Sequence, residues 1–201
     1  MNGRFITFEG IDGAGKSTHI SWFTEQLRKQ GRTVLQTREP GGPPLSERLR
    51  ELLLHEPMSA ETELLLVFAA RSEHLHQHIR PALARGEWVV CDRFTDSTFA
   101  YQGAGRGMSG AAIAWLESWV QHGLQPDRTY WFDLDPVLAA QRRAQARAAD
   151  RFEAEDVEFF KRVREGYAAR QSAHPTRFVR IDGAMPIDYI QQILYTSMIT
   201  I

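Results

Sequence analysis

The sequence reads Gly10-Ile11-Asp12-Gly13-Ala14-Gly15-Lys16-Ser17 close to its N-terminus, and this stretch decides the fold. It fits the phosphate-binding loop pattern of Gly, four residues, Gly, Lys and then Ser or Thr. Residues 5–8 before it are typical of a short strand, and residues 18–30 after it are typical of a helix closed by Gly31. Such a loop turns its backbone N–H groups inward, directs Lys16 to the terminal phosphates and lets Ser17 hold Mg²⁺. The stretch therefore predicts a nucleoside triphosphate site.

The scarcity of lysine strengthens this prediction. Lysine occurs only at positions 16, 29 and 161, and one of these falls where the motif needs it. The alternative is a Gly-rich turn between a strand and a helix, without a ligand. The flanking elements and the lysine together favour the phosphate site.

The composition is that of one globular domain. With 201 residues, 43% of them hydrophobic, the chain can build one well-cored α/β domain and is too short for two of ordinary size. The formal net charge of −1 argues against a protein that holds nucleic acid through its backbone charge. Cys91 is the single cysteine, so no internal disulfide can form. Because no apolar leader and no run of about 20 apolar residues is found, we expect a soluble cytoplasmic protein without a membrane partner.

Strand-like and helix-like segments alternate along the chain. Strands are predicted at 5–8, 33–37, 87–91, 129–134 and 178–181. Helices are predicted at 18–30, 44–54, 60–80 up to Pro81, after Ser109, after Pro136, at 153–172 and after Pro186. This alternation indicates a mostly parallel sheet covered by helices on both faces. One side of the apolar helix at 60–80 is a candidate subunit contact.

Charged residues follow several of the predicted strands, where ligands bind in sheets of this kind. Asp92 comes after four apolar residues, as expected of a carboxylate that holds Mg²⁺ directly or through water; a turn Asp that ends the strand is the alternative. Arg93 can direct its planar guanidinium to a phosphate, or else lies on the surface. Arg38-Glu39 and Asp135 stand at the same edge of the sheet.

Arginines also concentrate in residues 142–151. Phosphoryl transfer needs charge neutralisation, alignment and exclusion of water, so this segment is a candidate lid over the phosphates. The alternative is a solvated helix with paired charges. His74, His76 and His78 invite a zinc interpretation, but a third ligand at suitable spacing is missing, which favours an exposed helix end.

Six segments of the chain resemble the thymidylate kinase family in order and spacing. They are residues 10–18, Thr-Arg-Glu-Pro-Gly-Gly at 37–42, Phe-Ala-Ala-Arg at 68–71, Asp-Arg-Phe at 92–94, Ala-Tyr-Gln-Gly at 100–103 and Asp-Arg-Phe-Glu at 150–153. The resemblance covers essentially the whole chain, and the combination is far more specific than the glycine loop alone. It implies an α/β fold of the P-loop NTPase type, a three-layer α/β/α sandwich with a five-stranded parallel sheet, a lid at about 142–151 and a single domain over residues 1–201.

The family transfers the γ-phosphoryl group of ATP to dTMP with Mg²⁺, giving dTDP and ADP for dTTP synthesis. The resemblance implies this activity and a homodimer for the present chain. It implies that Gly10 to Thr18 bind the ATP phosphates, and that Ser17 and Asp92 hold the metal. Asp12 would contact the sugar 3′-hydroxyl or the phosphate of the acceptor, and Arg93 would hold that phosphate.

The same resemblance implies how the acceptor base is read. Arg71 would contact thymine O4, Phe68 would stack on the ring, Ser97 or Thr98 would meet the base edge, and Tyr101 would fill the space of a ribose 2′-hydroxyl. A phenyl face and an arginine on one helical face can indeed read a flat base. The family often has this Phe four residues before the Arg, where this chain has Val67. Further substrate contacts are implied for Arg38, Glu39, Arg48 and Gln102.

Members of the family carry an arginine either in the glycine loop or in the lid. This chain has Gly13 in the loop, so it resembles the version in which the lid supplies the arginine. Arg147 is the candidate catalytic arginine beside Lys16 and Arg93, with Arg143 or Arg151 as alternatives, and Arg143 is also a candidate ATP contact.

Two other functions remain open from the sequence. A deoxynucleoside kinase of similar fold would take an acceptor without a phosphate, whereas Arg93, Arg38 and Arg48 favour a monophosphate. A P-loop switch or regulatory ATPase would hydrolyse its nucleotide without an acceptor. A guanine-reading Asn-Lys-x-Asp motif is excluded, because the only asparagine is Asn2.

Overall fold

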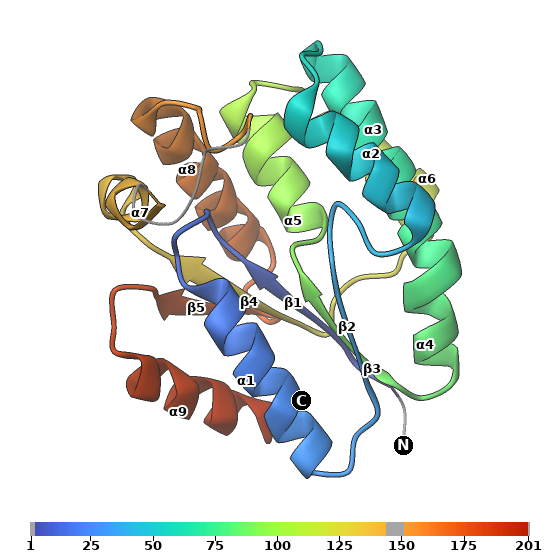
Figure 1. Cartoon of the computed structure of the whole chain (residues 1–201), viewed down its shortest axis with the longest axis vertical. Helices are drawn as coiled ribbons and strands as arrows, with labels where there is room; N and C mark the ends of the chain where they lie inside the picture. Colours follow the sequence, from blue (N-terminus) through green and yellow to red (C-terminus); the bar gives the residue numbers. More distant parts are fainter. Residues whose placement is uncertain (1–2, 144–150, 201) are drawn as a thin grey trace.

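Five parallel strands form the centre of the protein. The computed structural model describes residues 3–143 and 151–200. The strands are β1 (Phe5–Glu9), β2 (Val34–Arg38), β3 (Trp88–Asp92), β4 (Arg128–Asp133) and β5 (Phe178–Asp182), in the order β2-β3-β1-β4-β5 (Figure 1). All neighbouring pairs are parallel. The predicted five-stranded parallel sheet is confirmed, with the first strand at its centre.

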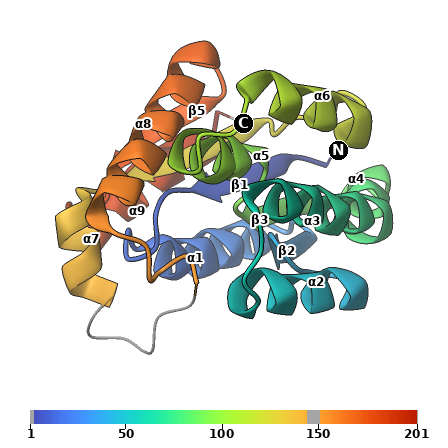
Figure 2. The same ribbon diagram turned by 90° about the horizontal axis from the view of Figure 1, so that it is seen from above.

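Helices cover both faces of this sheet. They are α1 (Lys16–Lys29), α2 (Pro44–His55), α3 (Ala60–His74), α4 (Arg80–Ala84), α5 (Thr95–Thr98), α6 (Gly110–Gln121), α7 (Pro136–Arg143), α8 (Val157–Ala173) and α9 (Ile187–Met198). Two π-helical segments, η1 (Leu75–Ile79) and η2 (Phe99–Gly105), join α3 to α4 and extend α5. Figure 2 shows α1 on one side of β1, and α5, α6 and α8 on the other. The three layers predicted from the sequence are therefore confirmed.

Strand β1 is buried along its whole length, and its two faces have different chemistry. Phe8 packs on the α1 side, with its ring centroid 5.4 Å from that of Phe23 and 5.1 Å from that of Tyr130. Thr7 and Glu9 bond to polar groups instead, Thr7 to Thr129 and Glu9 to residues around α5 and α8. The strand thus ends in a buried polar residue directly before the glycine loop.

The helix predicted at 60–80 differs from the prediction at its end. It does not stop at Pro81 but continues through η1 into α4, which ends at Ala84. The Arg80 N–H bonds to the carbonyl of Leu75, five residues earlier, and Pro81 lies in the first turn of α4. A proline is tolerated in a first turn, because its missing N–H interrupts no bond there. Helix α8 begins at Val157 rather than at 153, after Asp156 accepts a hydrogen bond from the Phe159 N–H as the N-cap. Within the described ranges, no helix has the length and apolar character needed to span a bilayer.

Candidate active site

The glycine loop connects β1 to α1 and needs glycine at specific points. At Gly13 the φ angle is +88°, and an added Cβ would lie 2.6 Å from the carbonyl oxygen of Ala139. Gly10 has φ +132° and lies against the backbone of Phe132. A side chain at either position would be strained and would clash. The loop therefore curves closely around the start of α1, as the sequence predicted.

Lys16 is the buried cation of this loop. Its ammonium donates hydrogen bonds to the carbonyl oxygens of Gly10 (2.9 Å) and Ile11 (3.2 Å) and lies 3.8 Å from the Asp12 carboxylate. Burial, followed by the nearby charge of Arg93, lowers the pKa of Lys16, while Asp12 raises it. Since Lys16 is only 6% exposed, its charge is poorly screened by water and acts strongly on an anion at the loop.

A pocket of about 110 Å³ opens beside the loop. Most of the predicted acceptor residues line it, namely Asp12, Glu39, Arg71, Arg93, Ser97, Thr98, Tyr101 and Gln102, together with Pro40, Arg50, Leu54, Val67, Phe94 and Phe152. These side chains come from the glycine loop and from the segments that follow β2 and β3. The structure thus brings the main sequence-predicted residues to one place at the carboxyl edge of the sheet, where ligands bind in such folds.

Arg71 is held on one side of this pocket by a network of mostly buried side chains. Its Nε donates to Glu39 Oε2 (2.7 Å), and its Nη2 donates to Thr98 Oγ1 (3.0 Å). Glu39 also bonds to His74 Nδ1 (2.9 Å), whose Nε2 lies 2.7 Å from Thr37 Oγ1. Burial opposes ionisation of Glu39, but Arg71 and His74 outweigh it and lower the pKa of Glu39. The charge of Arg71 is therefore compensated and its orientation fixed.

Arg93 lies on the other side, nearer to the glycine loop. It adopts a left-handed backbone conformation with φ +70°, which is unusual for a residue with a side chain. Its guanidinium donates to Asp12 (2.9 Å), Tyr167 Oη (3.1 Å) and Ser97 Oγ (3.4 Å), and lies 4.9 Å from the ring centroid of Tyr101. Although burial opposes its charge, Asp12 and the neighbouring groups raise the pKa of Arg93 well above its ordinary value. Arg93 is thus a permanent positive charge between the loop and the pocket.

The two candidate metal ligands share a second, more open hollow. Ser17 and Asp92 both line this space of about 450 Å³, together with Thr37 and Arg38. Asp92 Oδ1 is buried and has no hydrogen-bond partner within residues 3–143 and 151–200. A buried carboxylate oxygen beside a hydroxyl is the kind of oxygen ligand that Mg²⁺ prefers. Ser17 and Asp92 are therefore chemically suited to the ion.

Four predictions need correction. Phe68 does not line the acceptor pocket: its ring lies 4.9 Å from the Arg71 guanidinium and packs with Leu64, Ile113 and Leu116. Arg48 is exposed and outside the pocket. Arg38 pairs with Glu47 at 2.8 Å and lines the second hollow instead. His74 is fully buried rather than part of an exposed helix end, because its ring bonds to Glu39 and Thr37.

Several pocket residues were missed by the sequence analysis. Arg50, rather than Arg48, lines the pocket, and its Nη1 donates to the Pro40 carbonyl (2.9 Å). The buried residues Ser46 and Leu53 mark the inner face of α2, and Arg50 lies four residues after the first and three before the second. That spacing places Arg50 on the inner face and is a signal the sequence contains. Tyr167 of α8 has no such signal, since it reaches the site only through tertiary packing.

The proposed lid lies partly outside the described residues. This applies to all of Arg147 and to the side chain of Arg143. Arg142, at the start of the segment, donates to the carbonyls of Gly183 (3.0 Å) and Gly13 (3.4 Å), and so lies over the glycine loop. Arg151, at its end, pairs with Glu63 (2.7 Å), which also accepts a bond from Gln102 (2.8 Å). One end of the segment thus contacts the glycine loop, and the other pairs with Glu63, which holds the pocket residue Gln102.

The loop for a nucleoside triphosphate lies next to an arginine-bearing pocket, at one edge of a parallel sheet that helices cover on both faces. This arrangement defines a P-loop phosphotransferase of the nucleoside monophosphate kinase class. A family model described as thymidylate kinase matches residues 8–193. Curated proteins named thymidylate kinase from Ralstonia nicotianae and Bordetella petrii are 60% and 56% identical to this chain over 196 residues. These matches cover 96% and 98% of this chain, and 96% and 95% of the relatives. A crystal structure of thymidylate kinase from Ehrlichia chaffeensis has a TM-score of 0.81 and 33% identity, and the match covers 98% of this chain and 99% of that one. The chain belongs to the thymidylate kinase family.

Proposed function

We propose that the protein transfers the γ-phosphoryl group of ATP to dTMP, giving dTDP and ADP for dTTP synthesis. The observation that carries this proposal is the pair of arginines across the pocket of about 110 Å³, with Arg93 beside the loop lysine and Arg71 at the far side. Arg93 meets the acceptor phosphate, and Arg71 meets the thymine edge with Thr98. Tyr101 lines the same pocket, with its ring 4.9 Å from the Arg93 guanidinium, and this ring excludes a ribose 2′-hydroxyl.

Two anionic nucleotides repel each other, so the residues around the transfer point must offset this repulsion. Lys16 and Arg93 supply two of the charges, and the lid supplies a third through Arg147, with Arg143 on the ATP side. Mg²⁺, held by Ser17 and Asp92, neutralises charge on the phosphates of the donor when bound. Asp12 pairs with Arg93 and contacts the sugar 3′-hydroxyl of the acceptor. Lid closure excludes water from the transferred group.

An acceptor screen with ATP and Mg²⁺ tests this function. A coupled assay compares dTMP with dUMP, dCMP, dGMP and thymidine. We expect dTMP to be the best acceptor and dUMP to be the nearest competitor, because one methyl group is worth only about 1–3 kcal/mol of discrimination. Turnover of dTMP no better than that of dCMP or dGMP would refute the assignment of the base. Turnover of thymidine in place of dTMP would indicate a nucleoside kinase.

We also propose that two copies associate through α3 and α6. Leu65 (59% exposed), Trp115 (64%) and Trp119 (63%) lie on these helices, and the two tryptophan rings stack at 5.6 Å. Large apolar side chains gathered on one face are typical of a subunit interface. Sedimentation of the wild type and of Trp119→Asp tests this proposal. We expect the wild type to be a dimer and Trp119→Asp to be a monomer, and a monomeric wild type would contradict the proposal.

We further propose that the protein is a cytoplasmic enzyme with a single domain. The free, buried Cys91 and the match of one family model over residues 8–193 support this proposal.

A further inference from the structure

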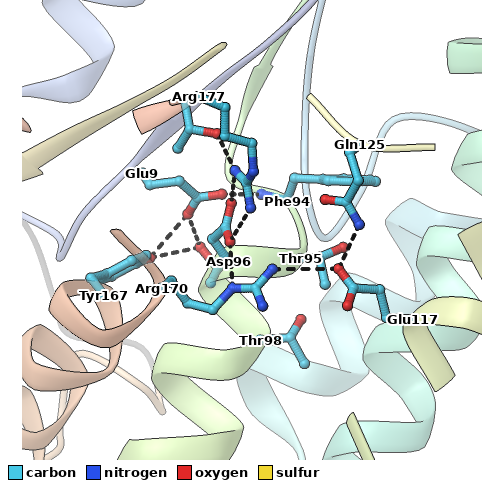
Figure 3. Close-up of polar contacts among 12 residues, drawn as sticks. Glu9, Phe94, Thr95, Asp96, Thr98, Glu117, Gln125, Tyr167, Arg170 and Arg177 are labelled. Atoms are coloured by element: carbon cyan, nitrogen blue, oxygen red, sulfur yellow. Dashed lines mark hydrogen bonds and ion pairs between the residues drawn. The ribbon is translucent and has the colours of Figure 1, made fainter. Parts of the chain in front are cut away.

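Glu9 is a buried carboxyl group behind the acceptor pocket that the mechanism above does not use. It is the last residue of β1, is 0% exposed, and stands immediately before the glycine loop. Oε1 accepts a hydrogen bond from the Phe94 N–H (2.7 Å). Oε2 lies 2.5 Å from Ser97 Oγ and 3.1 Å from Tyr167 Oη, and Figure 3 shows Glu9 facing Tyr167 across this cluster. Ser97 and Tyr167 are the same two hydroxyl groups that accept hydrogen bonds from Arg93.

The number of hydrogens available for the hydrogen bonds in this cluster indicates that Glu9 is protonated. Ser97 Oγ and Tyr167 Oη are also 2.7 Å apart, so the two hydroxyls and Glu9 Oε2 form a ring with three contacts. The two hydroxyls supply only two hydrogens to that ring. Arg93 donates into the lone pairs of both hydroxyls, so it leaves the count unchanged. A third hydrogen, on the Glu9 carboxyl, satisfies every contact.

The surrounding charges point the same way. Asp96, the neighbouring buried carboxyl, is bonded by Arg170 (2.7 Å) and by Arg177 (2.7 and 2.8 Å), as Figure 3 shows. Burial opposes the charge of Asp96, but these arginines outweigh it and lower the pKa of that carboxyl. Burial, reinforced by the charge of Asp96, raises the pKa of Glu9 to about 8, although Ser97, Arg93 and Phe94 act in the opposite direction. The titratable and charged groups that act on Glu9 or feel its charge are Arg93, Asp96, Tyr167, Lys16 and Cys91. Of the two carboxyls, Asp96 has the cationic partners and Glu9 keeps the proton.

We propose that Glu9 is a positioning residue that acts as a neutral carboxylic acid, closing a ring with Ser97 and Tyr167 that aims Arg93 at the acceptor phosphate. The neutral form matters because an ionised Glu9 would add a further anion to Asp12 and Asp92 around Arg93 and weaken its attraction for a phosphate. The inference rests on the proposed function for the identity of the acceptor. Glu9 touches neither nucleotide and acts through Arg93.

The Michaelis constant for dTMP, measured across pH 8 in wild type and Glu9→Gln, tests the proposal. An amide has the shape and neutrality of the protonated carboxyl. We expect the wild-type KM to be flat below about pH 8 and then to rise by up to about tenfold per pH unit. Glu9→Gln should keep the neutral-pH KM and lose this rise, while kcat changes little. Glu25→Gln, which neutralises an exposed carboxyl on α1, is the matched control and should keep the wild-type profile. Ionisation of the acceptor phosphate affects all three proteins and cancels in the comparison.

Tyr167→Phe extends the test to one of the two hydroxyls that link Glu9 to Arg93. We expect a several-fold higher KM for dTMP at every pH, because one of the three partners of Arg93 is lost. If Glu9→Gln raises KM at pH 7 as strongly as Glu9→Ala does, the ionised form is needed and the proposal is wrong. The proposal also fails if Glu9→Gln retains the wild-type rise above pH 8.

The unfolding free energy supplies a readout that does not depend on activity. The unfolded chain ionises Glu9 near pH 4.5, whereas the folded chain holds the proton up to about pH 8. The wild type should therefore lose stability relative to Glu9→Gln as the pH rises from 4.5 to 8, and a constant difference would contradict the buried proton. If dTMP is not phosphorylated at any pH, the proposed function is wrong, and so is the role of Glu9 toward the acceptor phosphate. Urea unfolding would still show whether Glu9 is protonated in the folded protein.

Discussion

The donor loop and the acceptor pocket are built in opposite ways. The loop is one continuous stretch, residues 10–18, and its shape comes from backbone groups and from glycines that tolerate no side chain. The pocket is assembled from side chains of many separate segments and is supported by buried carboxyl groups behind it, such as Glu39 and Glu9. A backbone site depends on few side chains, whereas a side-chain site depends on every partner that holds its residues. Substitutions should therefore act differently in the two regions.

The largest effect is expected at the loop. Lys16→Ala removes the buried cation beside the transferred phosphate, and we expect kcat to fall by about 10³-fold. The fold should keep its stability, because no partner of Lys16 is an otherwise unpaired buried charge: it bonds to two carbonyls, and Asp12 keeps Arg93. Single-turnover kinetics and urea unfolding measure the two quantities. Lys29→Ala, which removes an exposed lysine paired with Glu25, is the control and should leave both unchanged. A Lys16→Ala protein that retains its turnover would contradict the role of the loop.

Substitution of Arg71 should have the opposite effect to substitution of Lys16, with a large loss of stability. Arg71→Gln leaves the carboxylate of Glu39 buried without its arginine partner, with the His74 ring still bonded to it, and we expect a loss of about 3–5 kcal/mol of stability together with a higher KM for dTMP. Arg38→Gln is the matched control, because the Arg38 side chain is 52% exposed and its pair with Glu47 is worth at most about 1 kcal/mol. Urea unfolding of both variants makes the comparison. Equal stability losses would mean that the buried network does not support the pocket.

The same contrast explains how much the sequence could predict. The glycine loop, the five strands and the residues at the strand ends follow from local patterns, so they were found. The acceptor pocket depends on which side of a helix faces inward, and residues 64–70 are apolar around most of the circumference. The hydrophobic periodicity therefore could not show whether Val67 or Phe68 faces the acceptor pocket. Contacts such as Glu9 with Tyr167, 158 positions apart, depend on the packing of α8 against β1 and leave no trace in the order of residues.

The two arginines of α2 test that limit directly. Arg50→Gln should raise the KM for dTMP about tenfold, because it removes a charged donor that lines the pocket. Arg48→Gln changes the same type of residue two positions earlier, on the exposed side, and should leave KM unchanged. The ratio of the two KM values is the measurement, and both variants should unfold at similar urea concentrations. A larger effect of Arg48→Gln than of Arg50→Gln on KM would support the prediction from the sequence that Arg48 contacts the substrate.

The smallest effect is expected at Val67, where the pocket is lined by a side chain without charge. Val67→Ala removes two methyl groups from the pocket wall, so the KM for dTMP should rise by about threefold to tenfold, with a loss of about 1–2 kcal/mol of stability. Phe68→Leu changes the neighbouring residue, which packs with Ile113 and Leu116 and lies against the Arg71 guanidinium. That variant should lower the thermal midpoint and leave KM nearly unchanged, because the ring is outside the pocket. If instead Phe68→Leu alters KM and Val67→Ala does not, the phenyl ring stacks on the base after all. Recognition of the base would then depend on this one side chain more than on the buried network around Arg71.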